Sequence, residues 1–345
     1  MSNRDRSASD RRPRERRWLA RLASIAIVVA ASAAPRVWAQ NALFAAGRLA
    51  GTGGITSVDG SAGGGINPWA VIAGQETNDQ IGGTAAYTYV DLPNYRLHDF
   101  GAAIGLYDRV ELSFAHQQLT LGRTGGALDA AIGNFFGAPV SALPAPLQFG
   151  NDYAFRQDII GIKVRLHGHI VYDQNTLMPE ISVGLRYHHN ENGATIDAIG
   201  ARPDGMDYYV AASKLFIDGL FGRYTFVNLT LDVTNANQDG LLGFGGIGRN
   251  GRYTHGYSLE PGISVAQFIT RRVAVGYEFR AMPQNQLVGY NALGDAVSRT
   301  DPWQDIFAAW FINRHLSMTA AYAHLGHIAS LPGQNGAYVS LTASF

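Results

Sequence analysis

GAYVSLTASF, residues 336–345, is the stretch that decides the fold class. Apolar side chains stand at every second position, from Ala337 through Val339 and Leu341 to Phe345, and small or polar residues fill most of the positions between them. Successive side chains of a β-strand point to opposite faces, so this alternation predicts a strand with one apolar face. The pattern continues to an aromatic last residue, whereas most domains end in a frayed polar tail. We therefore expect this strand to be paired along its whole length.

The same period of two runs through most of the sequence, whereas helical periodicity is scarce. VNLTLDV at 227–233 alternates strictly, and ISVGLRY at 181–187 and VAVGYEF at 273–279 repeat the pattern. Most of the predicted strands reach the nine to eleven residues that a tilted strand needs to cross a bilayer. The pattern predicts strands at 47–58, 66–76, 80–91, 95–107, 109–120, 152–167, 179–190, 206–217, 222–235, 253–268, 272–283, 301–312, 315–326 and 335–345.

The connections between these strands alternate in length. Short polar turns such as LYDRV at 106–110 and FINRH at 311–315 alternate with long segments rich in Gly, Asn and Pro. Membrane barrels have short periplasmic turns and longer outer loops, and a soluble sandwich does not require this alternation. We therefore predict an all-β fold, a transmembrane antiparallel up-and-down β-barrel with both termini in the periplasm. It has fourteen strands, or twelve without the Gly-rich pair in 47–76.

The N-terminal residues have the composition of a secretory signal peptide. Residues 1–21 carry eight arginines, and an apolar run from Leu22 to Ala34 precedes a small-residue cleavage step ending at Ala39. We predict that residues 1–39 are removed and that residues 40–345 form the barrel. The mature chain then has 18 basic and 24 acidic residues, a net charge of −6, so the basic footprint of a nucleic-acid-binding protein is absent. The absence of cysteine excludes disulfides and thiol chemistry.

Several stretches resemble a known family. They are LAGTGGITSVDGSAGGGINPWAVIAG at 49–74, MPEISVGLRYHHN at 178–190, MDYYVAASKLF at 206–216, ANQDGLLGFGG at 236–246 and DIFAAWFINRHLSMTAAYAHLG at 305–326. They are similar to the proteobacterial exported-protein family known as domain of unknown function 3034. The resemblance covers nearly the whole mature chain and implies an outer-membrane β-barrel. It implies no activity and no site residues, because the family has no assigned function.

Charged residues within the predicted strands must face away from lipid, since Arg or Lys at the bilayer midplane costs about 2–4 kcal/mol. Their signs are mixed, so we expect no strong selectivity for anions or cations. Two interpretations stay open: the charges tune a polar channel, or they neutralise one another and fill the barrel. Lys214 and Asp305 are further candidates for inward positions. The predicted lumen-lining residues are Glu111, Lys163, Arg165, Glu180, Arg186, Asp232, Glu260, Glu278 and Arg280.

No catalytic residue, metal site or cofactor is predicted. The chain has no G-x-S-x-G, H-E-x-x-H or Walker motif. Ser113 near His116 is the candidate pair for a hydrolase on the barrel wall. The histidine pairs considered for metal ligation are His167 with His169 and His188 with His189. Aromatic residues near strand ends are expected to form interfacial girdles: Trp69, Tyr87, Tyr89, Tyr107, Tyr187, Trp303, Trp310 and Tyr322.

The favoured function is a passive porin-like channel for small solutes, hydrophobic or aromatic ones included, in the cell outer membrane. The apolar loop 121–151 is long enough to fold into the barrel or cover its mouth. The alternative is a structural or adhesive barrel closed by paired charges and by the Gly-rich start of the chain, and a barrel-embedded hydrolase has the least support. The expected partners are outer-membrane lipid, the outer-membrane assembly machinery and small solutes. The terminal Phe345 resembles the signal that this machinery reads.

Overall fold

The computed structural model describes residues 53, 55–171, 173–247, 253–254, 256–284, 299–329 and 331–345. The predicted signal peptide at 1–39 and the predicted strand residues 47–52 lie outside these ranges. Signal-peptide cleavage therefore stays a prediction.

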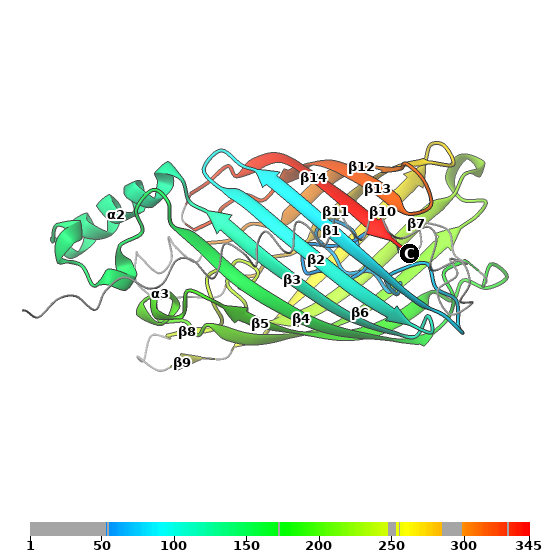
Figure 1. The fold of residues 1–345 in the computed structure, drawn as a ribbon, viewed down its shortest axis with the longest axis horizontal. Helices are drawn as coiled ribbons and strands as arrows, with labels where there is room; N and C mark the ends of the chain where they lie inside the picture. Colours follow the sequence, from blue (N-terminus) through cyan, green and yellow to red (C-terminus); the bar gives the residue numbers. More distant parts are fainter. Residues whose placement is uncertain are drawn as a thin grey trace, which may run out of the picture. The chain divides into compact units, whose positions relative to one another are not determined.

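Twelve antiparallel strands form one closed barrel (Figure 1). Each strand pairs with its neighbours along the chain, and the last strand, β14, pairs with the first, β1. A separate two-stranded sheet joins β8 (Gly246–Ile247) to β9 (Tyr253–Thr254). The prediction of an up-and-down barrel is confirmed, with twelve strands. The barrel strands are β1 (Ile81–Asp91), β2 (Arg96–Leu106), β3 (Val110–Thr120), β4 (Ala154–His167), β5 (Glu180–Asn190), β6 (Asp204–Phe216), β7 (Thr225–Thr234), β10 (Ser258–Phe268), β11 (Val273–Arg280), β12 (Trp303–Phe311), β13 (Leu316–His324) and β14 (Asn335–Ser344).

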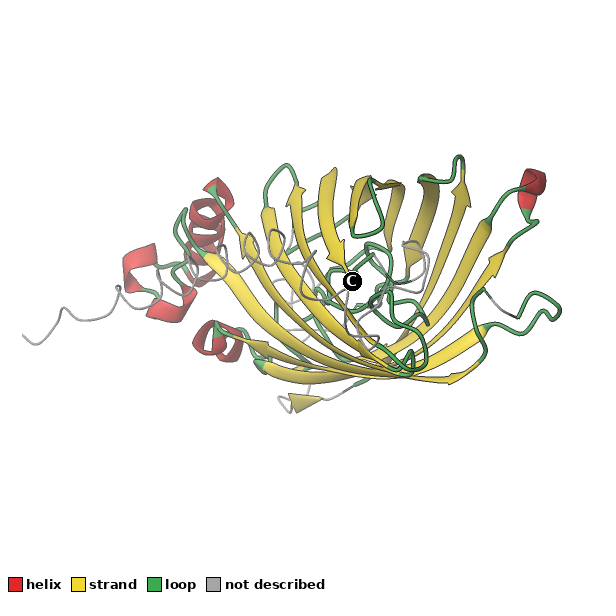
Figure 2. Ribbon diagram, turned by 45° about the vertical axis from the view of Figure 1, so that its right-hand side comes forward, coloured by secondary structure: helices red, strands yellow, loops and turns green. Residues whose placement is uncertain are grey.

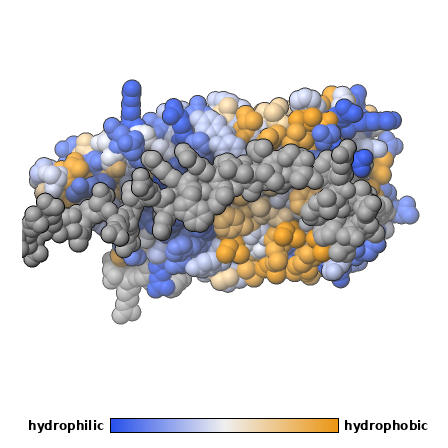
Figure 3. Space-filling model, in the orientation of Figure 1, coloured by the Kyte–Doolittle hydropathy of each residue, from blue (hydrophilic) through white to orange (hydrophobic). Residues whose placement is uncertain are grey.

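The barrel buries its polar side chains and exposes its apolar ones. In β7, Thr230 and Asp232 are buried while Leu229 is 54% and Leu231 49% exposed. Figure 3 shows hydrophobic side chains gathered over the middle of the strands, with hydrophilic ones toward the strand ends. A continuous apolar exterior of this kind is stable in hydrocarbon and not in water. The protein is therefore an outer-membrane β-barrel. None of the described helices has the length and apolar content that crossing a membrane requires.

Pairing of β14 with β1 closes the ring, from Thr84 opposite Ser344 to Asp91 opposite Ala337. The backbone of Phe345 extends this pairing, since its N–H donates to Gly83 O at 3.0 Å and its O accepts from Gly83 N at 2.9 Å. Closure leaves no unpaired strand edge, which a chain in lipid cannot tolerate. The alternation in GAYVSLTASF is therefore that of a strand paired on both sides.

The two ends of the barrel differ, as the connection lengths predict. The short-turn end carries the connections 107–109, 168–179, 217–224, 269–272 and 312–315, with η6 (Leu220–Gly222) in one of them. The long-loop end carries α2 (Arg123–Phe136), η4 (Val140–Ala142), η5 (Ala145–Leu147) and α3 (Gly193–Ala198). Figure 1 shows α2 beyond the strand ends, so this part of the 121–151 loop packs at the rim and does not enter the ring. In the long connection after β7, by contrast, residues 235–246 are all buried.

The predicted strands at 47–58 and 66–76 are wrong wherever the structure describes them. Residues 55–76, which we call the plug, form no long strand and make only isolated bridges, Thr56 with Ala62 and Gly63 with Pro68. Figure 2 shows loop segments running inside the ring of strands. Every plug residue is buried except the half-buried Val58. The plug lies in the lumen and is held there by the inner wall of the barrel.

Candidate functional site

The plug is a loop inserted from the short-turn end. Its two ends meet there, because Gly74 N donates to Gly53 O at 3.0 Å and Gln75 N donates to the Phe345 carbonyl at 3.1 Å. Between these ends the chain reaches further up the lumen, where the Gln117 side chain of β3 donates to Val58 O at 2.6 Å. The two ends of the plug therefore lie at the same opening of the barrel.

A buried ion pair on β3 and β4 holds the lower part of the plug. Lys163 and Glu111 lie 3.1 Å apart and are at most 1% exposed. The Lys163 ammonium also donates to Ala62 O at 3.0 Å and to Val71 O at 2.9 Å. Glu111 accepts from Ala62 N at 3.2 Å and Ala73 N at 2.8 Å. This pair binds the plug at two points along its length, and all of its contacts are shielded from water.

A second carboxylate, Glu278 of β11, holds the tip of the plug. It accepts hydrogen bonds from the backbone N–H groups of Gly65 and Ile66, the latter at 3.0 Å, and from the Ser264 hydroxyl. The Trp69 indole N–H donates to the same hydroxyl at 3.1 Å, and its ring packs on Phe226. Gly64 leaves no room for a side chain, since a Cβ there would lie within 2.4 Å of the Glu278 carboxylate.

Two arginines connect the plug to the wall and to the loop at 235–246. Arg186 of β5 pairs with Asp59 of the plug and with Asp232 of β7. Arg280 of β11 pairs with Glu260 at 2.8 Å and with Asp239 of the loop at 3.1 Å, and it donates to Ile66 O at 3.4 Å. Buried guanidinium groups need several acceptors to offset their lost hydration. The network therefore ties plug, wall and loop into one polar unit.

All nine predicted lumen-lining residues are buried, at 0–3% exposure. Seven of them belong to the contacts just described. Arg165 instead pairs with Asp108 at 2.5 Å and lies 3.9 Å from Glu180 near the short-turn end. Lys214 donates to the carbonyls of Asp173 and Met178 in the 168–179 turn. The sequence could not indicate that the partners of many of these side chains would come from the plug.

The buried ionisable side chains are of both signs, as predicted from the sequence, and acidic ones predominate. Among the described residues of the strands, the short turns, the plug and the loop at 235–246, five Lys and Arg side chains are buried against twelve Asp and Glu side chains. The bases are Lys163, Arg165, Arg186, Lys214 and Arg280. The acids are Asp59, Glu76, Asp99, Asp108, Glu111, Glu180, Asp207, Asp232, Asp239, Glu260, Glu278 and Asp305. The lumen therefore holds more than twice as many buried carboxyl groups as buried Lys and Arg side chains.

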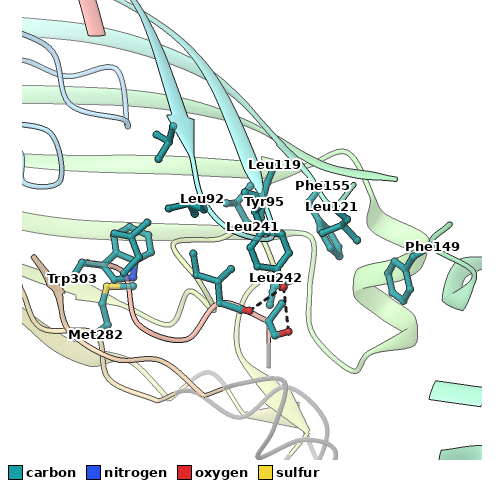
Figure 4. Packing of buried hydrophobic residues seen from close by; sticks show 14 of the residues in the cluster. Leu92, Tyr95, Leu119, Leu121, Phe149, Phe155, Leu241, Leu242, Met282 and Trp303 are labelled. Carbon is teal, nitrogen blue, oxygen red and sulfur yellow. Dashed lines mark hydrogen bonds between the residues drawn. The ribbon is translucent and has the colours of Figure 1, made fainter. Parts of the chain in front are cut away.

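An apolar cavity of about 60 Å³ lies against the tip of the plug. Its wall includes Leu92 and Leu119, and Leu241 comes from the loop at 235–246. Figure 4 shows these three side chains in one cluster with Tyr95, and it shows Trp303 beside Met282. The cluster joins the plug, the inner wall and the long-loop connections, so the cavity sits where the three meet.

Tyr95 and Asp301, both outside the strands, have shifted pKa values. Burial raises the pKa of the Tyr95 hydroxyl above its ordinary range, and this hydroxyl donates to Ile328 O at 3.1 Å (Figure 4). The hydrogen bond with the His327 ring lowers the pKa of Asp301. Both contacts fasten the 325–334 connection to its neighbours at the long-loop end.

The histidine and serine candidates are separated by the pleat of the strands. Ser113 is buried on the inner face whereas the His116 side chain is 38% exposed on the outer face, so the two do not meet. His188 points inward to Asp207 at 3.0 Å, while His189 points outward to Asp204 at 2.7 Å.

On the outer face, His116, Asp158 and Glu191 place possible ligand atoms within 4.8 Å of one another. His116 and Asp158 already share a hydrogen bond of 2.7 Å. Neither predicted histidine pair belongs to this group.

The prediction of an interfacial position is wrong for two of the aromatic residues. Trp69 is 4% and Trp303 8% exposed, and both lie inside the barrel. Tyr87, Trp310 and Tyr322 are 46–62% exposed on the outer surface, as a girdle requires. The sequence around a tryptophan does not distinguish an interfacial position from a lumenal one, because the indole borders polar groups in both.

A family model described as "Protein of unknown function (DUF3034)" matches residues 52–342. The chain belongs to this family. The resemblance noted from the sequence is thereby confirmed, and the match spans the plug as well as the strands. No curated protein matches the sequence.

Solved structures similar to the chain are outer-membrane barrels. The KdgM porin is 7% identical with a TM-score of 0.43, covering 76% of this chain and 99% of its own. The NanC porin is 9% identical with a TM-score of 0.44, covering 76% and 98%. The COG4313 outer membrane channel from Pseudomonas putida F1 is 12% identical with a TM-score of 0.42, covering 81% and 97%. Similarity at this level says nothing about which solute, if any, this chain carries.

Proposed function

We propose that the protein is a porin-like channel for small solutes that rests in a closed state, and that displacement of the plug opens it. The observation that carries this proposal is the way the plug enters the lumen. Both of its ends lie at the short-turn end, where Gly53 bonds to Gly74, so it can withdraw as a loop without threading through the barrel. The wall it leaves behind, with Glu111, Lys163 and Glu278, is polar enough to be hydrated.

The acidic excess of the lumen supports small cationic or neutral solutes over anions. The apolar cavity at the tip of the plug supports solutes with apolar surface, hydrophobic or aromatic ones included. Solute charge and apolar character are therefore two separate properties that transport measurements can vary independently.

A structural barrel with a permanently closed lumen is the second candidate. The buried ion pairs favour it, because removing one partner of such a pair costs about 3–5 kcal/mol. Lys163 with Glu111 and Arg186 with Asp59 both join plug to wall in this way. The two candidates share one structure and differ only in whether the plug leaves.

A reversible lock on the plug separates the candidates. A Cβ built on Gly101 of β2 lies 3.4 Å from Cγ2 of Thr56 in the plug. In a disulfide the Cβ of one cysteine lies about 3 Å from the sulfur of the other, so Thr56→Cys with Gly101→Cys can form one after a small shift. The built Cβ also lies 3.1 Å from Gly60 Cα, so the plug backbone at Gly60 must move by a few tenths of an ångström to admit the side chain. The chain has no other cysteine to interfere.

Planar-bilayer recordings of the double variant should give discrete conductance steps under reducing conditions and silence after oxidation. Each single cysteine variant should conduct under both conditions, which controls for effects of the oxidant. Conductance that the disulfide does not alter would overturn the plug as the gate. A folded, heat-modifiable protein that is silent when reduced would overturn the channel and leave the structural barrel.

A further inference from the structure

The wall of the cavity at the tip of the plug includes an acidic side chain that accepts no hydrogen bond from the described residues. Val58, Gly65 and Ile66 of the plug form one side of the cavity, and Trp303 and Tyr338 line the wall. Asp305 of β12 also lines it and is 2% exposed. Neither carboxylate oxygen of Asp305 accepts a hydrogen bond from any residue the structure describes. An unpaired carboxylate in such a position is costly unless it takes up a proton or a ligand supplies the missing donors.

The surroundings of Asp305 favour a cation. Glu278 stands directly opposite it in the pairing of β11 with β12. Arg280 does not pair with Asp305, since its ion pairs within the described chain are with Glu260, Asp232 and Asp239. The two facing carboxyl groups oppose each other's ionisation, and a bound ammonium group offsets this repulsion where a neutral donor does not.

The remaining walls fit an apolar body with one polar end. A Cβ placed on Gly65 would lie 3.0 Å from Asp305 Oδ2 and 3.1 Å from the Tyr338 hydroxyl, so the carboxylate and this ring flank one glycine. Trp303 lies on the same strand two residues before Asp305, and two residues apart on a strand share a face. Aromatic rings beside an ammonium add cation–π attraction. Leu92, Leu241 and Leu325 close the apolar part.

We propose that this cavity binds a small primary amine, with the ammonium on Asp305 and an aliphatic or aromatic body among the leucines, Trp303 and Tyr338. A volume of about 60 Å³ corresponds to about four to six water-sized groups, which sets the size of the ligand. This inference rests on the proposed function in naming a solute class for the same lumen. Binding can nevertheless be measured on the closed barrel, without any conductance.

The test uses n-butylamine as the probe, its neutral isostere n-butanol, and calorimetric titration of the folded barrel in detergent micelles. The wild type should bind the amine at least tenfold more tightly than the alcohol. Asp305→Asn should weaken amine binding at least tenfold and leave the alcohol unchanged. Asp158→Asn on the outer face is the matched control and should alter neither. Heat-modifiable migration establishes that each variant is folded.

Equal binding of amine and alcohol by the wild type would overturn the role of Asp305, as would amine binding that survives Asp305→Asn. The absence of saturable amine binding to the folded wild type would overturn the site itself. A barrel that binds the amine but never conducts would leave this inference standing and remove the proposed channel. A barrel that conducts but does not bind the amine would overturn this inference and leave the proposed channel standing.

Discussion

Substituting Lys163 by methionine tests how firmly the plug is held. Its ammonium makes three contacts of 2.9–3.1 Å, two to plug carbonyls and one to Glu111, all in a fully buried position. Removing one partner of a buried pair costs about 3–5 kcal/mol. Glu111 keeps its hydrogen bonds from Ala62 and Ala73, which places the cost near the lower end, about 3 kcal/mol.

This cost falls mainly on the closed state, because Lys163 and Glu111 can be hydrated once the plug has left. A shift of about 3 kcal/mol changes an equilibrium constant more than a hundredfold, since every 1.4 kcal/mol is a factor of ten. Single-channel recording of Lys163→Met should therefore show the ratio of open to closed time rising by about two orders of magnitude. The free energy of unfolding of the barrel wall should change much less.

Lys214→Met is the matched control, because Lys214 is the only other lysine and donates to the 168–179 turn rather than to the plug. It should leave channel opening unchanged. The double variant Lys163→Met with Glu111→Gln should cost less than the sum of the two single changes, because each single change leaves an unmatched group. Unchanged opening in Lys163→Met, with the protein folded, would refute the clamp.

Three further results are expected. Asp305→Leu should raise the free energy of unfolding by about 1–3 kcal/mol, measured as a higher temperature of heat-modified migration, because it removes two buried oxygens that accept no hydrogen bond from the described residues; a lower temperature would contradict this. The lowered pKa of Asp301 means that its bond to His327 stabilises the long-loop end above the ordinary Asp pKa and is lost as pH falls through the lowered value; limited acid proteolysis of the 325–334 connection should reveal this loss, and Asp301→Asn should abolish the pH dependence. Deleting Phe345 should impair insertion into the outer membrane, since it removes the bonds to Gly83 as well as the predicted assembly signal; insertion at the normal yield would count against that role.

The strands were predictable because each carries its own alternation. VNLTLDV shows apolar and polar faces without reference to any other segment, and the structure places β7 at 225–234 against a predicted 222–235. The inward direction of Glu111 and Arg280 followed from the cost of charge in lipid, which is equally local. These inferences needed no knowledge of partners.

The plug could not be predicted in the same way. GGITSVDGSAGGGINPW alternates loosely enough to resemble a strand, and only its contacts with distant residues show otherwise. Trp69 meets Ser264 across 195 positions of sequence. The loop at 235–246 did contain a local signal, since Leu241, Leu242 and Phe244 are too apolar for an exposed loop. The acidic excess was only partly predictable, because Asp59, Asp108 and Asp239 lie outside the strands. Asp99 and Asp207 lie within β2 and β6, and the sequence analysis did not count them among the inward residues.

Hydrogen exchange followed by mass spectrometry, on the folded full-length barrel, tests the central claim most directly. The plug amides of Ala62, Ile66 and Ala73 donate to wall carboxylates in the lumen. Their exchange should be slowed to minutes or hours, approaching that of the barrel strands, and Lys163→Met should accelerate it. Exchange of residues 55–76 within seconds in the wild type, at the rate of an unstructured chain, would contradict a barrel closed by its own N-terminal segment.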